Sequence, residues 1–449
     1  MAEVIPLRAL RYNPAVVEDL SHVVAPPYDV ISPAAQERYY ARHPYNVIRL
    51  ILARESDPEA PGESRYQRSA RAFAAWRAEG VLRRDAAPAL YPYEQEFSTG
   101  ARRLRRRGFL ALVRLQDYGA RIIFPHERTF SRHKEDRLQL MRACRANLEA
   151  ILGFYPGPRA DMEAILERRM ATDPAVRLED EEGVGHRLWV LDDPADVTAL
   201  GAALVDRPIF IADGHHRYET ALRFRDQEQA AETAPPELAR RRLHHYVLIH
   251  LVHAEDPGLV ILPTHRLIRQ RPALAGDALR AALARHFAVE PFPVGSDDPG
   301  GSVRQVLQRF ARQEGISCAL YAGGPEFLIL TLTDAGVQDE FLQEGRSAAY
   351  AGLDVAVLHR QVIERLLGLS PEAQADDAIR YTRDEAEAVG AVRAGEAHLA
   401  LFLNPPRAAQ VEAVALAGER IPQKSTYFYP KVLSGLVISP LDPDDLAPV

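Results

Sequence analysis

The sequence predicts a mixed α/β (α+β) fold, and three observations lead to it. With 47% hydrophobic and 26% charged residues, the composition is that of an ordinary globular protein, which excludes disorder, a fibre and a coiled coil. Short apolar runs alternate with segments of helical periodicity along most of the chain. A chain of 449 residues predicts two or three domains, because a typical domain has about 150 residues.

The first 85 residues mix short strands with helices. Residues 22–31 are turn-like because two consecutive prolines interrupt them, and the apolar run 46–52 predicts a strand. Residues 64–80 predict a helix, because apolar side chains recur there at helical spacing. These side chains are Tyr66, Ala70, Phe73 and Trp76.

The next segments predict a hairpin, an arm and a strand. Residues 89–98 and 106–117 alternate in polarity and are joined by a turn, which predicts a β-hairpin. The basic run at this turn fits a solvated hairpin end, and a polyanion contact is the alternative. Residues 125–152 predict a turn followed by a helix, and residues 186–193 predict a strand.

The region from 207 to 268 has the clearest α/β pattern. In order, we expect a strand, two helices and two strands at 207–213, 215–230, 236–243, 245–254 and 258–268. Helix and strand alternate again after residue 300.

The stretch 291–301 is rich in Pro and Gly and predicts a linker between two domains. The first domain then covers residues 1–290, with the hairpin and the arm inserted near 88–160. The second domain is a C-terminal α/β region over 300–449, and it contributes the strand in KSTYFYPK, residues 424–431, to the site.

Charge and cysteine content limit the function. The 55 basic and 62 acidic residues give a net charge of −7, which argues against a nucleic-acid partner because such a protein needs a basic face. The N-terminus lacks a charged start followed by an apolar segment, and no apolar run approaches the roughly 18 residues of a membrane helix. We therefore expect a cytoplasmic protein with no membrane partner. Cys144 and Cys318 form neither a disulfide framework nor a metal knuckle.

Lysine occurs only at Lys134, Lys424 and Lys431, so 52 of the 55 basic residues are Arg. Drift toward arginine codons explains the bias. It does not explain the exceptions, and a site that needs a compact ammonium with a tunable pKa would retain Lys. All three lysines fall inside the motifs described next.

The segment IFIADGHHRYETAL, residues 209–222, predicts a strand, a turn and a helix. This geometry directs free backbone N–H groups at an anion above the turn. His215, His216 and Arg217 lie in the first helical turn, where cations are disfavoured, so we expect a phosphate to offset them. Gly214 would allow the backbone to approach this phosphate closely, and Arg217 would make bidentate contacts with it.

Two other interpretations of this segment stay open. Asp213 could cap the helix beside two surface histidines. Alternatively, Asp213, His215 and His216 could bind zinc or manganese, although adjacent helical residues face different directions.

The second motif, IPQKSTYFYPK at residues 421–431, resembles a Walker loop but lacks its second Gly, and we reject that assignment. As a strand, it would place hydroxyl groups on one face beside lysines, which suits a phosphorylated or carboxylated ligand. The residues concerned are Lys424, Ser425, Thr426, Tyr427, Tyr429 and Lys431. The alternative is an edge strand protected by Lys and Pro.

Three further positions could bring polar side chains into a site. His126, Glu127 and Arg128 would enter from a loop before Lys134, although a charged, exposed helix start also explains this segment. Asp29 follows two prolines that stiffen the backbone, which suits a carboxylate base, and a plain turn is the alternative.

The third position is the strand end at His265 and Arg266, which a merely polar strand end also explains. Neither Gly-x-Gly-x-x-Gly nor Gly-x-Ser-x-Gly is present, so a dinucleotide fold and a hydrolase elbow lack support. Phosphate chemistry remains.

These motifs together resemble a known family. APPYDVIS, NVIRL, YEQEF, PHERT with KEDR, ADGHHRYETAL, LPTHR and KSTYFYPK, in this order, are similar to the uncharacterised family DUF1015 over essentially the whole chain. The DGHHR segment also resembles the phosphate-binding turn of the ParB and sulfiredoxin superfamily, which includes nucleotide-hydrolysing ParB proteins and a free-serine kinase. The resemblance implies a ParB/sulfiredoxin-like nucleotide-binding core, with phosphates at Gly214, His215, His216 and Arg217.

The resemblance also implies a carboxylate that activates the substrate hydroxyl. We assign that role to Asp29, with Glu94, Glu96 and Glu127 as rivals. The leading hypothesis is a nucleotide-dependent phosphotransferase for a small hydroxylated metabolite such as free serine. The nucleotide would be ATP, ADP or CTP.

In this hypothesis Lys424 neutralises the transferred group, and Asp213 helps to hold Mg²⁺. The alternatives are a ParB-like nucleotide-hydrolysing switch and a metal-dependent phosphatase. A homodimer is also open.

Overall fold

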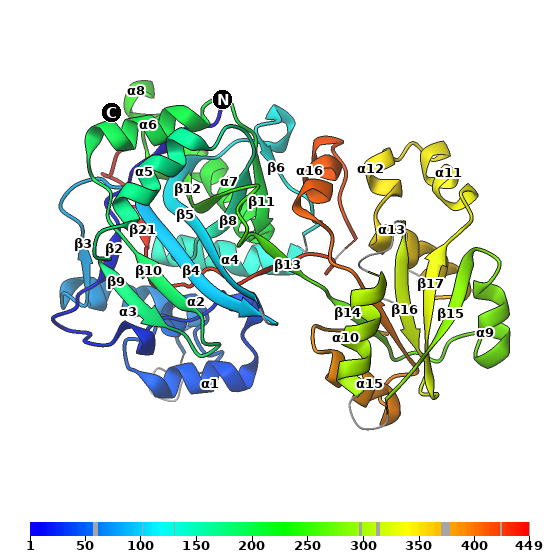
Figure 1. Ribbon diagram of the computed structural model, residues 1–449. Coiled ribbons are helices and arrows are strands. Elements are labelled where there is room, and N and C mark those ends of the chain that lie inside the picture. Colours follow the sequence, from blue (N-terminus) through cyan, green and yellow to red (C-terminus); the bar gives the residue numbers. More distant parts are fainter. Residues whose placement is uncertain are drawn as a thin grey trace. The chain divides into compact units, whose positions relative to one another are not determined.

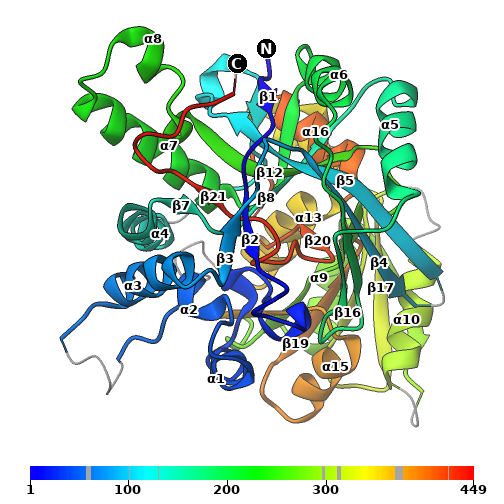
Figure 2. The ribbon, with the colours of Figure 1, turned by 90° about the vertical axis from the view of Figure 1, so that its left-hand side faces the viewer.

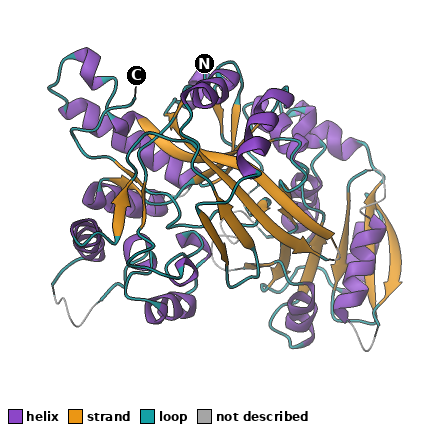
Figure 3. Cartoon of the chain, turned by 60° about the vertical axis from the view of Figure 1, so that its left-hand side comes forward, coloured by secondary structure: helices purple, strands orange, loops and turns teal. Residues whose placement is uncertain are grey.

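The computed structural model describes residues 1–56, 62–100, 102–129, 131–295, 299–310, 315–369, 378–422 and 424–448. The chain forms two compact units. Unit 1 comprises Met1–Pro125, Thr129–Val260 and Pro430–Val449, and unit 2 comprises His126–Arg128 and Ile261–Tyr429. Both units combine helices with strands, so the fold is mixed α/β (Figure 3).

Unit 1 is built on a mixed sheet with the strand order β6-β11-β8-β12-β5-β4-β10-β9, and β1 pairs with β5 (Figure 1). The pairs β6–β11 and β8–β12 are parallel, and the others are antiparallel. The strands are β1 Val4–Ile5, β4 Tyr91–Thr99, β5 Arg102–Arg114, β6 Ile123–Phe124, β8 Ile151–Tyr155, β9 Val176–Glu179, β10 Gly185–Leu188, β11 Ile209–Asp213 and β12 Tyr246–His253. The predicted hairpin is present as β4 and β5.

Helices cover this sheet, and α4 packs against both α3 and α7 (Figure 2). The helices of unit 1 are α1 Pro33–Arg42, α2 Ile48–Ile51, α3 Arg65–Ala78, α4 Ser131–Cys144, α5 Ala160–Met170, α6 Pro194–Leu204, α7 His215–Ala231 and α8 Pro236–Ala239, with short 3₁₀ turns η1 Leu20–His22, η2 Tyr28–Val30, η3 Tyr118–Ala120 and η4 Leu243–His245. The predicted helix at 64–80 is confirmed as α3. Ser64 and Gln67 start it with a capping box, and Phe73 and Trp76 are buried.

Two local predictions are wrong, for identifiable reasons. The run 46–52, expected as a strand, contains the short helix α2 instead, because the Asn46 side chain accepts the Ile48 N–H at 2.9 Å and turns the backbone just before this helix. The arm helix expected up to residue 152 ends at Cys144, since Arg145 takes a left-handed conformation with φ 47°. Strands β7, Ala146–Asn147, and β8 follow instead.

The C-terminal segment of unit 1 runs along its N-terminal part. Ser434 pairs with Ala25 and Ile438 with Leu10, and β21, Ser439–Pro440, pairs with β7. Strands β2, Leu10–Tyr12, and β3, Leu82–Arg84, form a further ladder beside these contacts. The segment after Pro430 is therefore an integral part of unit 1.

Unit 2 contains an antiparallel sheet with the order β15-β17-β16-β19-β14-β18. Its strands are β14 His265–Ile268, β15 Phe287–Pro293, β16 Ser317–Tyr321, β17 Glu326–Leu332, β18 Ile379–Thr382 and β19 Leu399–Leu403, and a separate ladder joins β13 Val260–Leu262 to β20 Tyr427–Tyr429. Its helices are α9 Gly276–Leu283, α10 Pro299–Phe310, α11 Gly336–Gln343, α12 Ala348–Ala351, α13 Asp354–Leu358, α15 Glu385–Arg393 and α16 Ala408–Leu416, with the π-helix η5 His359–Leu366.

The stretch 291–301 is not a linker. Its first residues complete β15, which pairs with β17 through Pro293, and α10 begins at Pro299, while residues 296–298 lie outside the described residues. The units divide at residues 260 and 261 rather than near 290, and the tail returns to unit 1. Among the described residues, no helix is both long and apolar enough to cross a membrane.

Candidate functional site

The turn between β11 and α7 has the predicted strand, glycine and helix order. Gly214 is the N-cap with φ 99°, a left-handed conformation that favours glycine, and no side chain caps the helix there. A Cβ at Gly214 would lie 3.0 Å from the Arg217 guanidinium. Asp213 therefore does not cap this 17-residue helix, and its N-cap residue Gly214 contributes no side-chain hydrogen bond.

Asp213 is held between two cations. Its Oδ2 accepts a hydrogen bond from Arg217 Nη2 at 2.7 Å, and its Oδ1 accepts one from Lys431 Nζ at 2.5 Å. Burial alone would raise the pKa of Asp213, but Lys431 and Arg217 hold it well below its usual range. The carboxylate is thus ionised throughout the physiological range.

Arg217 is buried and connects this turn to the residue directly before strand β8. Its Nη1 also donates to the carbonyl oxygen of Ala150. Burial would lower its pKa, but the nearby Asp213, Glu149 and Asp29 carboxylates raise it. An arginine has five N–H donors, and the contacts described here use two of its nitrogens.

Glu149 and Arg137 are parts of the site that sequence reasoning missed. Glu149 accepts the Tyr28 N–H at 2.9 Å and lies 3.5 Å from Arg137, whose guanidinium stacks over the Tyr28 ring at 4.0 Å. Burial raises the pKa of Glu149, against the effect of Arg217 and Arg137. Residues 149 and 150 thereby fix both Arg217 and the turn that carries Asp29.

Asp29 lies exposed in η2, directly after this anchored tyrosine. The negative charge of Asp29 acts to raise the pKa of both Arg217 and His216, although burial outweighs this effect at His216. The three side chains therefore share one electrostatic environment. Arg137, Glu149 and Arg217 also border a cavity of about 40 Å³. It has room for about one water molecule.

His216 does not carry the positive charge expected in the first turn of α7. Burial, followed by His133 with its ring 5.2 Å away, lowers the pKa of His216 from 6.5 to about 4. Arg217 is paired with Asp213. His216 and Arg217 are therefore not uncompensated cations, and the expectation of a phosphate here rests on the backbone N–H groups of the first turn.

The pKa of His216 predicts a pH-dependent stability. Between pH 6.5 and about 4, His216 binds a proton in the unfolded chain but not in the folded chain. The free energy of unfolding therefore decreases as the pH falls through this window. We expect His216→Gln to flatten the fall in urea midpoint over this window, whereas the exposed control His398→Gln should not. Equal slopes for wild type and His216→Gln would contradict the buried environment of His216.

Lys134 and the first residues of the arm meet α7. Lys134 Nζ donates to Glu219 Oε2 at 2.9 Å, and Thr129 Oγ1 donates to the same oxygen at 2.6 Å. Lys134 also lowers the pKa of His216, so it lies in the same electrostatic environment. The lysine predicted from the KEDR motif is thus brought to the helix that carries the DGHHR turn.

The KSTYFYPK segment is divided between the units. Pro430 and Lys431 belong to unit 1, where Lys431 contacts Asp213. Lys424 belongs to unit 2, is exposed and has φ 55°. The strand is shorter than predicted, since β20 includes only Tyr427–Tyr429, with Phe428 buried between the partly buried tyrosines.

Unit 2 gathers a second set of the predicted residues. His126 Nε2 shares a hydrogen bond of 2.8 Å with the Thr426 hydroxyl, and Arg266 Nη2 donates to Ser425 Oγ at 3.2 Å. Burial lowers the pKa of His265 to about 4 and that of Arg266 to about 10. In the same unit, Glu127 is half-buried, Arg128 is exposed, and the Arg383 guanidinium stacks over the Tyr427 ring at 3.7 Å.

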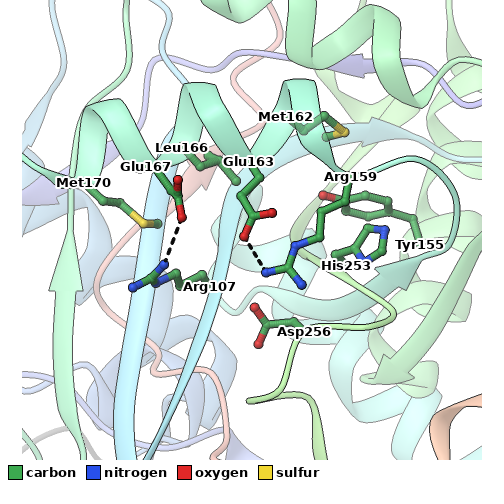
Figure 4. Close-up of a pocket in the computed structure, with 10 residues that line it drawn as sticks. All are labelled: Arg107, Tyr155, Arg159, Met162, Glu163, Leu166, Glu167, Met170, His253 and Asp256. Atoms are coloured by element: carbon green, nitrogen blue, oxygen red, sulfur yellow. Dashed lines mark hydrogen bonds and ion pairs between the residues drawn. The ribbon is translucent and has the colours of Figure 1, made fainter.

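The rival carboxylates Glu94 and Glu96 are engaged elsewhere, in cross-strand ion pairs. Glu94 contacts Arg107 at 3.0 Å and Arg187 at 2.7 Å, and Glu96 contacts Arg105 at 2.9 Å. Arg107 also borders a small cavity of about 30 Å³ under α5, which contains none of the predicted site residues (Figure 4). Three arginines of the basic run at the hairpin end, Arg103, Arg105 and Arg107, are thus paired with carboxylates of the sheet.

No metal site is preformed in the parts of the chain that the structure describes. They contain no group of three His, Cys, Asp or Glu side chains that could hold an ion. Both oxygens of Asp213 are already bonded to cations, so a metal ion there would compete with Lys431 and Arg217. Asp213 therefore does not fit the predicted role of a Mg²⁺ ligand, and Asp213, His215 and His216 do not fit the zinc or manganese alternative. We derive no step through a metal.

Comparisons with known proteins identify a family. The model of "Protein of unknown function (DUF1015)" matches residues 4–356. No curated protein matches the chain. Similar solved structures include a free serine kinase in complex with AMP, with 11% identity, a TM-score of 0.33 and coverage of 69% of this chain and 86% of the other.

A conserved hypothetical protein from Pyrococcus furiosus shows 13% identity, a TM-score of 0.30 and coverage of 69% and 90%. SbnI from Staphylococcus aureus, truncated at its C-terminus, shows 14% identity, a TM-score of 0.34 and coverage of 75% and 90%. These likenesses are too distant to carry an argument about activity.

Proposed function

The chain belongs to the DUF1015 family, and we propose, from its own residues, that it is a nucleotide-dependent phosphotransferase acting on a small hydroxylated metabolite such as free serine. The observation that carries the proposal is the start of α7, where the backbone N–H groups of the first helical turn adjoin Asp213, Arg217 and Lys431. A helix N-terminus attracts anions through these N–H groups and the helix dipole. Phosphate groups of ATP, ADP or CTP fit this environment.

In this proposal each residue has a role in positioning or charge. The N–H groups of His215 and His216 bind phosphate oxygens, and Arg217 and Lys431 supply positive charge that they otherwise share with Asp213. Asp29 accepts the proton of the substrate hydroxyl, supported by its place beside Arg217 and His216. Phosphoryl transfer depends mainly on such positioning and electrostatic stabilisation.

The two lysines of KSTYFYPK provide a prediction. We expect Lys431→Ala to reduce phosphotransfer about 100-fold or more, as loss of a group that stabilises developing charge does, and Lys431→Arg to restore only part of it, because Lys431 contacts a single carboxylate oxygen. Lys424→Ala and Lys424→Arg, measured in the same assay, test the role predicted for Lys424. Unchanged turnover in Lys431→Ala would exclude Lys431 from the site, and unchanged turnover in Lys424→Ala would exclude Lys424.

The function is tested by incubating the protein with ATP, ADP or CTP, Mg²⁺ and pooled hydroxylated metabolites, followed by phosphorus NMR. New phosphoester signals support the phosphotransferase. Nucleotide hydrolysis without a phosphorylated product favours the ParB-like switch, and release of phosphate from phosphorylated metabolites without nucleotide favours the phosphatase. Absence of any change with every nucleotide contradicts the proposal.

A further inference from the structure

Buried polar side chains of the β4–β5 hairpin hold the backbone on both sides of Lys431. Gln95 Nε2 donates to the Lys431 carbonyl at 2.8 Å, and Arg106 Nη2 donates to the Pro430 carbonyl. The backbone of Leu433 hydrogen-bonds to the Tyr93 hydroxyl. Three hairpin side chains thereby fix the backbone from Pro430 to Leu433, which is how a residue near the C-terminus reaches Asp213.

Arg106 is the central member of this group. It is fully buried, and its Nε and Nη2 also donate to Gln95 Oε1, which orients the amide toward Lys431. Its guanidinium donates to a neutral amide and to a carbonyl, and within the described residues it forms no ion pair with a carboxylate. A buried guanidinium without a carboxylate partner is costly, and the hydrogen bonds to Gln95 and Pro430 offset part of that cost.

We propose that Arg106 is a positioning residue that, through Gln95 and the Pro430 carbonyl, holds Lys431 against Asp213 and thereby prepares the start of α7 for an anionic ligand. The inference rests on the proposed function for the identity of that ligand. The geometry of the contact between Lys431 and Asp213 can be tested without it. Arg106 also lies close enough for the Asp213 charge to act on its pKa, so its positive charge favours an anion in the same environment.

The scarcity of lysine makes a direct test feasible. Because the chain contains only Lys134, Lys424 and Lys431, reductive ¹³C-methylation of the protein should give a lysine signal for each, assigned through Lys→Arg variants. Lys431 is 10% exposed and paired with Asp213, so we expect its signal to differ from that of the exposed Lys424. Lys134, paired with Glu219, serves as an internal reference.

In Arg106→Lys and Gln95→Met, we expect the Lys431 signal to move toward that of Lys424 while the Lys134 signal stays in place. The matched control is Arg105→Lys, on the same strand but half-exposed and paired with Glu96. An unchanged Lys431 signal in a folded Arg106→Lys or Gln95→Met protein would overturn the inference. Gln95→Met keeps the test available if Arg106→Lys fails to fold.

The same variants separate this inference from the proposed function. If the wild-type protein binds ADP, Arg106→Lys and Gln95→Met should raise its Kd at least about tenfold, one factor of ten being about 1.4 kcal/mol. Arg105→Lys should leave the Kd unchanged. If the wild-type protein binds no ADP, the proposed function fails, and the lysine signals alone decide whether Arg106 positions Lys431.

Discussion

Arg217→Ala is expected to abolish nucleotide binding and to lower the free energy of unfolding by about 3–5 kcal/mol, the range seen when one partner of a buried ion pair is removed. Arg217 is 7% exposed and donates to Asp213 and to the Ala150 carbonyl. Without Arg217, Asp213 keeps Lys431 as its cation partner among these contacts. The buried Glu149 carboxylate loses one of the positive charges that stabilise its ionised form. Urea unfolding and equilibrium binding of ADP measure the two effects.

The matched control for this variant is Arg223→Ala, on the same helix but exposed and paired with Glu135. It should change stability by no more than about 1 kcal/mol, because surface ion pairs contribute little, and it should bind ADP as the wild type does. Arg217→Ala binding ADP with wild-type affinity would remove Arg217 from the phosphate site. A wild-type free energy of unfolding would show that the buried ion pair is not formed.

Asp29→Asn is expected to reduce phosphotransfer by about 10²–10⁴-fold, the usual contribution of a general base, while ADP affinity changes little. The substitution keeps the shape of the side chain but removes the proton acceptor. Because Asp29 is exposed and Tyr28 carries the backbone anchor to Glu149, the fold should tolerate it. Steady-state kcat and KM, with ADP binding measured separately, distinguish a loss of proton transfer from a loss of binding.

Glu18→Gln, an exposed carboxylate of the same N-terminal region, is the control for Asp29→Asn and should keep wild-type kcat. If Asp29→Asn keeps wild-type kcat, the base is a group other than Asp29. If Asp29→Asn loses ADP binding and turnover together, Asp29 acts on the nucleotide rather than on the hydroxyl.

Sequence patterns predicted those helices and strands that are determined by residues close together in the chain. The helix at 64–80 and the hairpin are present because apolar periodicity and turn residues fix them over short distances. The run 46–52 could not be distinguished from a strand by its apolar residues, and the side chain of Asn46 decided for a helix. The end of α4 depends on the left-handed conformation of Arg145, a non-glycine residue that gives no such signal in the sequence.

The site was predictable where its residues are contiguous and hidden where they are not. The DGHHR turn could be found because strand, glycine and helix follow one another in the chain. Glu149, Arg137 and Arg106 could not, because their roles depend on tertiary contacts with Tyr28, Arg217 and Pro430. Sequence alone also gave no reason to separate Lys424 from Lys431, seven positions apart but in different units.

The most direct test is a crystal structure of the protein with a non-hydrolysable ATP analogue. We predict phosphate oxygens within hydrogen-bond distance of the backbone N–H groups of His215 and His216, with Lys431 or Arg217 contacting the same phosphates. The Asp29 carboxylate should face the terminal phosphate across a space large enough for a hydroxylated substrate. A nucleotide bound elsewhere, with the start of α7 free of phosphate, would contradict the account.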